Sequence, residues 1–286
     1  MASAPTFGTV TAMARILALS SHVAFGSVGL AAIVPALHWL GHEVLAVPTV
    51  VLSSHPGYPR FAGNPVPVEQ LDEILNAMEA NGWFGETAAV LTGYLPTLDH
   101  VRLARRAVEG VRAANPAMTY LCDPVFGDEP EGVYVPGGIP TALRDELLPL
   151  ADITSPNRFE LSWLSGLPVT GPEEARLAAE SLSARSVLVT SVPAPDNRLA
   201  NILFEGERGL ACFVRRRVSA PHGTGDLLAA MFLGNKLNNH SPSYCLGASA
   251  SAVDASVAAS MSRGELPLAS AGALWASARV LPAAPV

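Results

Sequence analysis

Four consecutive residues, Gly223, Thr224, Gly225 and Asp226, offer the clearest chemistry in the sequence, and an apolar, alanine-rich run follows them. We expect both glycines to adopt backbone angles that a Cβ would obstruct. A helix beginning near Thr224 would turn unpaired N–H groups and the positive end of its dipole toward an anion such as a phosphate. A carboxylate beside a bound phosphate can take the proton from an attacking hydroxyl, which makes Asp226 a candidate base. The alternative is an ordinary acidic residue in the first turn of a helix.

A second group of carboxylates follows the short apolar run 118–122. Asp123 comes directly after this run, and Asp128 follows a glycine five residues later. Two carboxylates around a glycine turn can hold water or Mg²⁺, which takes oxygen ligands. Asp-Pro and Gly-Asp are also ordinary turn formers, so these residues by themselves leave both interpretations open.

The elements that must position these residues are short buried strands. Apolar runs that polar or turn residues interrupt, with helix patterns between them, are typical of a parallel sheet. Such runs cover residues 15–20, 88–94, 118–122, 152–155 and 186–191. Because parallel strands end at one edge of a sheet, where ligands bind, the polar residues that end these runs are expected near one another. They are Ser21, Tyr94, Asp123, Ser155, Thr190 and Ser191.

Three further segments border this edge. Residues 43–52 predict another strand, in which Pro48 indicates an edge position or an irregular ladder. Residues 53–67 predict either a mobile substrate loop, with His55 as its candidate contact, or a plain connection. Residues 155–160 predict the start of a helix, with Ser155 as its cap and Glu160 as an early acid.

The composition narrows the class of protein. The chain has 286 residues and a net charge of −7, and its only notable basic cluster, 215–217, is short, so nucleic acid is a poor candidate partner. It lacks the uninterrupted apolar span of about 18 residues that predicts a membrane helix. Three widely spaced cysteines indicate reduced thiols and a cytoplasmic location. We expect a flexible N-terminal tail over residues 1–14 and a single α/β domain over residues 15–286.

Four segments together resemble a known family. Residues 222–226, His-Gly-Thr-Gly-Asp, resemble the C-terminal signature of the ribokinase-like kinases. Residues 20–29, 46–54 and 122–128 resemble those of the pyridoxal (vitamin B6) kinases, and the match runs from about residue 15 to about residue 260. The resemblance implies the ribokinase-like fold, a three-layer α/β/α arrangement with a central, mostly parallel sheet. It also implies ATP-dependent phosphorylation of the 5′-hydroxymethyl group of pyridoxal, and of pyridoxine and pyridoxamine as further candidates.

The resemblance also implies roles for residues. Asp226 is the base, and Gly223, Thr224 and Gly225 form the anion hole. The substrate-binding residues are Ser21, His55, Tyr94 and Asp226. The ATP-binding residues are Asp123, Ser155, Asn157, Glu160, Thr190, Ser191, Thr224 and Gly225. The metal-site residues are Asp123, Asp128, Glu160 and Tyr134, the last within a lid loop over residues 129–138.

ATP and Mg²⁺ are therefore the expected cosubstrate and metal, and the family also suggests a homodimer. Dependence on a monovalent cation such as K⁺ stays open, as do the ring contacts of residues 53–67, where Pro56 and Gly57 depart from the family. Two rival functions remain at this point. One is another small-alcohol kinase of the superfamily, acting on a hydroxymethylpyrimidine or a sugar, and the other is a non-catalytic protein that binds B6 or a nucleotide.

Overall fold

A computed structural model of the chain describes residues 13–260 and 264–286. The strands are β1 (Arg15–Val23), β2 (Glu43–Leu52), β3 (Gly63–Pro65), β4 (Thr87–Thr92), β5 (Thr119–Cys122), β6 (Gly127–Asp128), β7 (Gly132–Val133), β8 (Ile153–Thr154), β9 (Ser186–Ala194), β10 (Arg198–Glu205), β11 (Arg208–Arg215) and β12 (Ala284–Pro285). The α-helices are α1 (Leu30–Trp39), α2 (Val68–Ala80), α3 (Trp83–Glu86), α4 (Leu98–Ala114), α5 (Ile139–Ala142), α6 (Arg158–Ser165), α7 (Pro172–Glu180), α8 (Thr224–Leu237), α9 (Pro242–Ser260) and α10 (Ala271–Ser277). Most of the predicted N-terminal tail, residues 1–12, lies outside the described residues.

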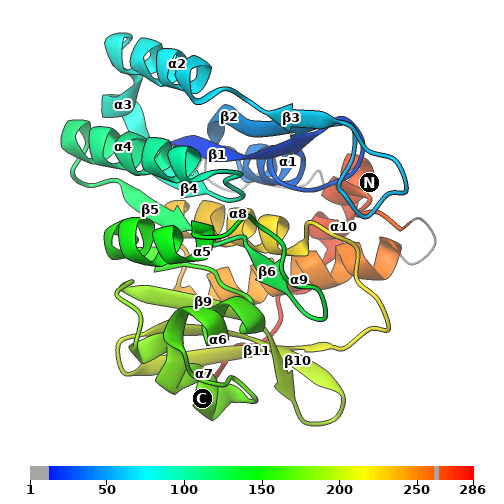
Figure 1. Cartoon of the computed structure of the whole chain (residues 1–286). Coiled ribbons are helices and arrows are strands. Elements are labelled where there is room, and N and C mark those ends of the chain that lie inside the picture. Colours follow the sequence, from blue (N-terminus) through cyan, green and yellow to red (C-terminus); the bar gives the residue numbers. More distant parts are fainter. Residues whose placement is uncertain (1–12, 261–263) are drawn as a thin grey trace, which may run out of the picture.

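One large sheet runs through the molecule (Figure 1), with the strand order β12-β11-β10-β9-β8-β5-β4-β1-β2-β3. Neighbouring strands from β2 through β1, β4, β5 and β8 to β9 are parallel. Antiparallel strands extend both edges, β3 beyond β2 and β10 to β12 beyond β9. The prediction of a mostly parallel central sheet is confirmed.

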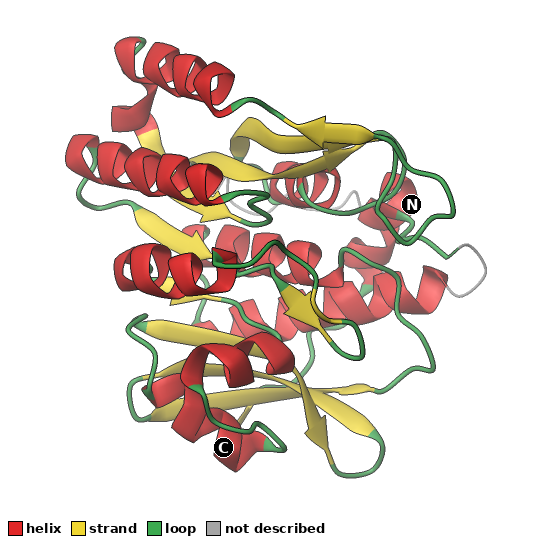
Figure 2. Cartoon of the chain, viewed as in Figure 1, coloured by secondary structure: helices red, strands yellow, loops and turns green. Residues whose placement is uncertain are grey.

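Helices cover both faces of this sheet (Figures 1 and 2). Successive side chains of a strand point to opposite faces, so alternate residues join different cores. In β1, Ile16 and Ala18 pack in one core with residues of α1, α8, α9 and α10, whereas Leu17 and Leu19 pack in another with residues of α2, α3 and α4. Residues of α6 and α7 form a third cluster with residues of β9 to β11. These contacts make up the predicted three-layer α/β/α arrangement.

The order of the strands determines where a ligand can bind. From β1 the chain passes to β2 on one side and later to β4 on the other, so the connections leave β1 in opposite directions. Ligands of open α/β sheets bind at such a switch point, beyond the carboxyl ends of the strands. The residues that follow β1, β4, β5 and β8 therefore face one region.

Two strand predictions need refinement. β1 does not stop at residue 20 but continues to Val23, although its pairing with β4 ends at Leu19 and Thr92, so Ser21 still lies beyond the end of β4. The ladder between β1 and β2 shifts register between Ser20 and Ser21, opposite Pro48, which confirms the irregularity that Pro48 predicted. Among the described residues, every helix falls short of the length and apolarity needed to cross a bilayer.

Candidate active site

The glycine turn before α8 is held by a close backbone contact. Gly223 has a φ of 88°, in the region that favours glycine, and a Cβ built on it would lie 1.7 Å from the carbonyl oxygen of Ser27. Gly225 differs from our expectation, because it lies in the helical first turn of α8 and a Cβ there would meet no atom within 4 Å. The backbone angles at this position therefore do not require a glycine, and the missing side chain of Gly225 leaves open space beside the helix N-terminus.

Asp226 lies in the first turn of α8, as predicted, and its carboxylate binds the residue that precedes α1. Its Oδ2 accepts a hydrogen bond of 2.9 Å from the backbone N–H of Gly29. A Cβ built on Gly93 would lie 3.8 Å from its Oδ1, so the loop before α1 and the residue after β4 both approach this carboxylate. Burial raises the pKa of Asp226, and the Gly29 hydrogen bond partly opposes that rise. The sequence reasoning missed Gly29 and Gly93, although each is a glycine directly beyond a predicted strand or before a helix.

Asp123 lies beside Asp226 in the region beyond β5. Its side chain is 5% exposed, and its Oδ1 accepts a 2.9 Å hydrogen bond from the hydroxyl of Ser155. Burial, together with the charge of Asp226, raises the pKa of Asp123 to about 8. The prediction that Ser155 caps the following helix is wrong, because Asn157 occupies the N-cap and Ser155 serves the aspartate instead.

Glu160 is largely used by the backbone around it. It forms a capping box with Asn157, and its Oε2 accepts from the Asn157 N–H at 2.9 Å. Its Oε1 accepts from the N–H groups of Phe126 and Gly127, at 3.0 and 3.4 Å. Burial, followed by the charge of Asp123, raises the pKa of Glu160 well above its usual value. Glu160 thus holds the loop after Asp123.

Asp128 lies in β6, and Tyr134 directly follows β7, the other strand of the small sheet. Asp128 is exposed and accepts from the N–H of Glu129, and the charges that act on its pKa are those of Glu131, His222 and Arg158. Burial, followed by the charges of Glu160, Asp123, Asp226 and Asp128, raises the pKa of the Tyr134 hydroxyl, although 49% of the residue as a whole is exposed.

The donor set fits Mg²⁺ with few protein ligands. Among the described residues, no Lys, Arg or His side chain forms an ion pair with Asp123 or Asp226. Within the described parts of the chain, no three His, Cys, Asp or Glu side chains are arranged to hold a metal by themselves. Mg²⁺ usually keeps several waters and takes one or two carboxylates together with phosphate oxygens. Asp123 is accordingly the best placed of the predicted metal residues.

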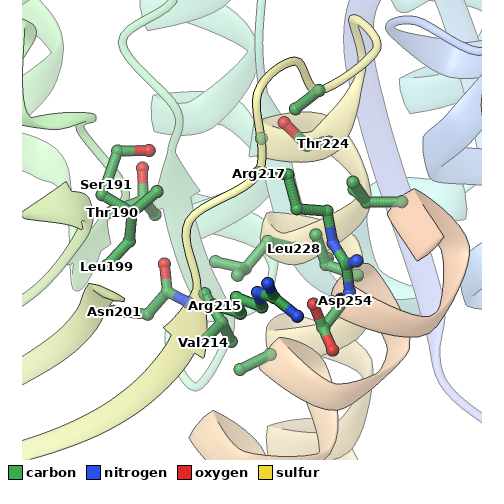
Figure 3. A pocket seen from close by; sticks show the side chains of 15 residues that line it. Thr190, Ser191, Leu199, Asn201, Val214, Arg215, Arg217, Thr224, Leu228 and Asp254 are labelled. Carbon is green, nitrogen blue, oxygen red and sulfur yellow. Dashed lines mark hydrogen bonds and ion pairs between the residues drawn. The ribbon is translucent and has the colours of Figure 1, made fainter. Parts of the chain in front are cut away.

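A pocket beside the N-terminus of α8 contains other predicted residues (Figure 3). Thr190, Ser191, Thr224 and Gly225 line it together, and Thr190 forms an isolated bridge with Asn157. The wall deeper in the pocket is apolar, with side chains such as those of Val214, Leu228, Val253 and Val257. Hydroxyls at one end and an apolar wall at the other suit a nucleotide, with phosphates near α8 and the base among the apolar residues.

The sequence reasoning missed the polar residues near the part of the pocket that suits the nucleotide base. Asn201 is 8% exposed at an irregularity in the pairing of β10 with β9, and it lines the pocket. Across the pocket, Arg217 donates from its Nη2 to the Oδ1 of Asp254 at 2.6 Å (Figure 3). Neither a strand register shift nor a contact between Arg217, beyond the end of β11, and Asp254 in α9 leaves a local signal, so only the fold brings these groups together.

Two of the predicted ring contacts lie near Asp226. A Cβ on Gly29 would approach the Oγ of Ser21 to 2.3 Å, so Ser21 lies against the glycine that binds Asp226. Tyr94 is partly buried, and its backbone N–H donates to the Oγ of Ser20 at 3.2 Å. Ser21 thus lies in the last part of β1 and Tyr94 just beyond β4, each next to a glycine that approaches the carboxylate.

The third predicted ring contact, His55, is bound to other residues. Its Nε2 is 3.1 Å from the Oε1 of Glu265, and its ring is tilted against that of His222, with 4.2 Å between the ring centroids. His222 directly precedes the glycine turn. His55 therefore borders the site through His222, while its own polar atoms are occupied.

The raised pKa of Asp123 predicts that stability depends on pH in metal-free buffer. The folded protein holds this proton with a pKa of about 8, against 3.8 for an ordinary aspartate, and therefore binds more protons than the unfolded chain between these values. The free energy of unfolding should then fall as pH rises from about 4 to about 8, by up to ~1.4 kcal/mol per pH unit. Urea unfolding of the parent and of Asp123→Asn, with exposed Asp99→Asn as the control, measures this. Parallel curves for the parent and Asp123→Asn would contradict it.

The sheet, its switch point and the acidic helix N-terminus define the class of protein as a kinase of the ribokinase-like fold. The sequence model of the phosphomethylpyrimidine kinase family matches residues 62–268. The pyridoxal kinase PdxY of Corynebacterium diphtheriae is 38% identical over 246 residues, covering 84% of this chain and 87% of that protein. The pyridoxal kinase of Leishmania donovani in complex with ADP and pyridoxamine has a similar structure, with a TM-score of 0.89 and 28% identity over 95% of this chain and 99% of the other. The chain belongs to the pyridoxal kinase family.

Proposed function

We propose that the protein transfers the terminal phosphoryl group of ATP to the 5′-hydroxymethyl group of pyridoxal, and of pyridoxine and pyridoxamine. The observation that carries this proposal is the position of Asp226. Its carboxylate lies in the first turn of α8, is held by the N–H of Gly29, and adjoins a helix N-terminus that Gly225 leaves open. A base and an anion site are thus side by side, as phosphoryl transfer to an alcohol requires.

The chain's residues divide the work of transfer. Asp226 accepts the proton of the substrate hydroxyl, and its raised pKa improves it as a base provided that it is ionised. The N–H groups of the first turn of α8 stabilise the negative charge on the transferred group. Thr190, Ser191 and Thr224 line the adjoining pocket and bind the phosphates of the nucleotide.

We further propose that Mg²⁺ takes part. Asp123 would hold the ion, directly or through its waters, and Ser155, Glu160 and Tyr134 would position that carboxylate and the water shell. When bound, the ion neutralises charge on the phosphates. Asp123 and Asp226 would then both be stabilised in their ionised forms, which burial otherwise disfavours.

The identities of the relatives support the choice of substrate. Proteins that are 36 and 37% identical to this chain, from Rubrobacter xylanophilus and Bordetella bronchiseptica, are a pyridoxal kinase and a pyridoxine/pyridoxal/pyridoxamine kinase. The Leishmania donovani enzyme also has a structure with ADP and pyridoxine. We also propose a single domain over residues 15–286, a homodimer and a cytoplasmic location, which rest on the family resemblance alone.

A substrate panel tests the proposal. Release of ADP from ATP and Mg²⁺ is measured with pyridoxal, pyridoxine, pyridoxamine, hydroxymethylpyrimidine and ribose. We expect turnover with one or more B6 vitamers and none with ribose. Efficient turnover of hydroxymethylpyrimidine alone would make the protein a hydroxymethylpyrimidine kinase instead, and binding without ADP release would indicate a non-catalytic protein.

Ser21 gives a sharper test of the B6 ring. We expect the Ser21 hydroxyl to donate to the ring nitrogen, so Ser21→Ala should remove ~0.5–1.5 kcal/mol of binding and raise KM for pyridoxal roughly two- to tenfold. KM for ATP should change little, because Ser21 lies at β1 and not in the pocket beside Thr190. Ser277→Ala, on the exposed side of α10, is the control. A rise in KM for ATP alone would refute this assignment.

A further inference from the structure

One carboxylate outside the catalytic group joins three distant segments. Glu265 is 9% exposed, and its Oε1 accepts the hydroxyl of Tyr58 at 2.9 Å and lies 3.1 Å from the Nε2 of His55. Its Oε2 accepts the backbone N–H of Ser27 at 3.2 Å. One oxygen therefore binds the loop that follows β2, while the other binds the loop that precedes α1.

Both of those loops border the candidate active site. The hydroxyl of Ser27 donates to the carbonyl of Leu266 at 2.9 Å. The backbone carbonyl of Ser27 lies so close to Gly223 that a Cβ there would clash with it. Two residues further on, the N–H of Gly29 binds Asp226. On the other side of Glu265, the ring of His55 rests on that of His222, which precedes Gly223 in the chain.

Two side chains of the loop, those of His55 and Tyr58, contact this carboxylate. Tyr58 also lies edge-on to Phe25, with ring centroids 6.0 Å apart, so an apolar contact accompanies its hydrogen bond. Arg60 and Phe61, further along the loop, are exposed. Hydrogen bonds to a charged, buried acceptor are stronger than those between neutral groups, so the loop should lose much of its fixed position without Glu265.

We propose that Glu265 is a positioning residue that fastens the substrate loop, residues 53–62, to the Gly26–Gly29 loop and thereby closes the B6 side of the active site. This inference rests on the proposed function and goes beyond it by assigning a task to the segment after α9. It predicts an effect on the binding of pyridoxal but not of ATP, because the residues of the nucleotide pocket include neither Glu265 nor any residue of the substrate loop.

The experiment compares the full-length parent with Glu265→Gln, Tyr58→Phe and the double variant. Glutamine keeps the size of Glu265 but offers a single acceptor oxygen, so it cannot bind Tyr58 and Ser27 from two oxygens. Glu79→Gln, on the exposed side of α2, is the matched control. The measurements are KM for pyridoxal, KM for ATP, the melting temperature, and the rate at which trypsin cuts after Arg60.

We expect Glu265→Gln to raise KM for pyridoxal roughly tenfold with KM for ATP unchanged, and to speed cleavage after Arg60 about fivefold or more. Tyr58→Phe should produce a smaller change in the same direction. In the double variant the two effects should add to less than their sum, because both changes weaken the attachment of the same loop. A purely structural role would lower the melting temperature and affect both KM values alike.

The proposal is overturned if Glu265→Gln leaves KM for pyridoxal unchanged, if both KM values rise together, or if cleavage after Arg60 keeps the parental rate. If Glu265→Gln does not fold, Tyr58→Phe decides by the same measurements. The trypsin comparison uses no substrate, so it tests whether Glu265 fastens the loop even if the parent fails to phosphorylate pyridoxal. That failure would count against the proposed function, whereas an unchanged cleavage rate counts against the positioning role of Glu265.

Discussion

Replacing Asp226 by asparagine should lower kcat by a factor of roughly 10²–10⁴, the usual contribution of a positioned general base. Asparagine has nearly the shape of aspartate, and its amide oxygen can still accept the N–H of Gly29 that holds Asp226 at 2.9 Å. Only the basicity is lost. KM for ATP should therefore stay close to that of the parent, since the pocket that contains Thr190 and Thr224 is untouched.

The measurement is kcat at saturating pyridoxal, ATP and Mg²⁺, with nucleotide affinity measured separately by calorimetry. Asp196→Asn, in the turn between β9 and β10, is the control, because it removes the same charge from a distant position where φ is 59°, which asparagine accepts. Near-parental kcat for Asp226→Asn would show that Asp226 is only a first-turn acid of α8. A loss of nucleotide affinity equal to the loss of kcat would also remove it from the role of base.

The fold could be predicted because its signals are local. The runs at 15–20 and 118–122 are apolar because strands between two helical layers are buried on both faces, as Leu17 and Ile16 show by joining opposite cores. Pro48 likewise predicted a ladder irregularity from its own chemistry. The order of the strands has no such local signal, and it entered only through the resemblance to the ribokinase-like kinases.

The candidate site could be predicted where one residue and its neighbours suffice. Asp226 in the first turn of a helix and Asp123 directly after a strand could both be predicted in this way. Ser155 shows where this reasoning fails, because a serine before Pro156 fits a helix cap, yet its hydroxyl binds Asp123, 32 residues earlier. Glu265 lies 210 residues from His55 along the chain, so only tertiary structure could reveal their contact.

Gly225→Val should abolish most of the activity while leaving the protein folded. A side chain at this position meets no atom within 4 Å in the chain itself, and valine is a better helix residue than glycine. The space it fills is where the phosphoryl group must approach the N–H groups of α8. We expect kcat to fall roughly 10²–10³-fold, as when an anion-hole donor is lost, with a melting temperature equal to or above that of the parent.

Gly223→Ala is the matched comparison, since it alters the other glycine of the same turn. Its Cβ would lie 1.7 Å from the carbonyl oxygen of Ser27, at a φ of 88°. This variant should lose ~1–3 kcal/mol of unfolding free energy or more, together with its activity. Thermal melts and kcat for both variants distinguish an open ligand site from a packed turn. If Gly225→Val turns over like the parent, the N-terminus of α8 does not hold the transferred group, and if it melts like Gly223→Ala, Gly225 serves the fold instead.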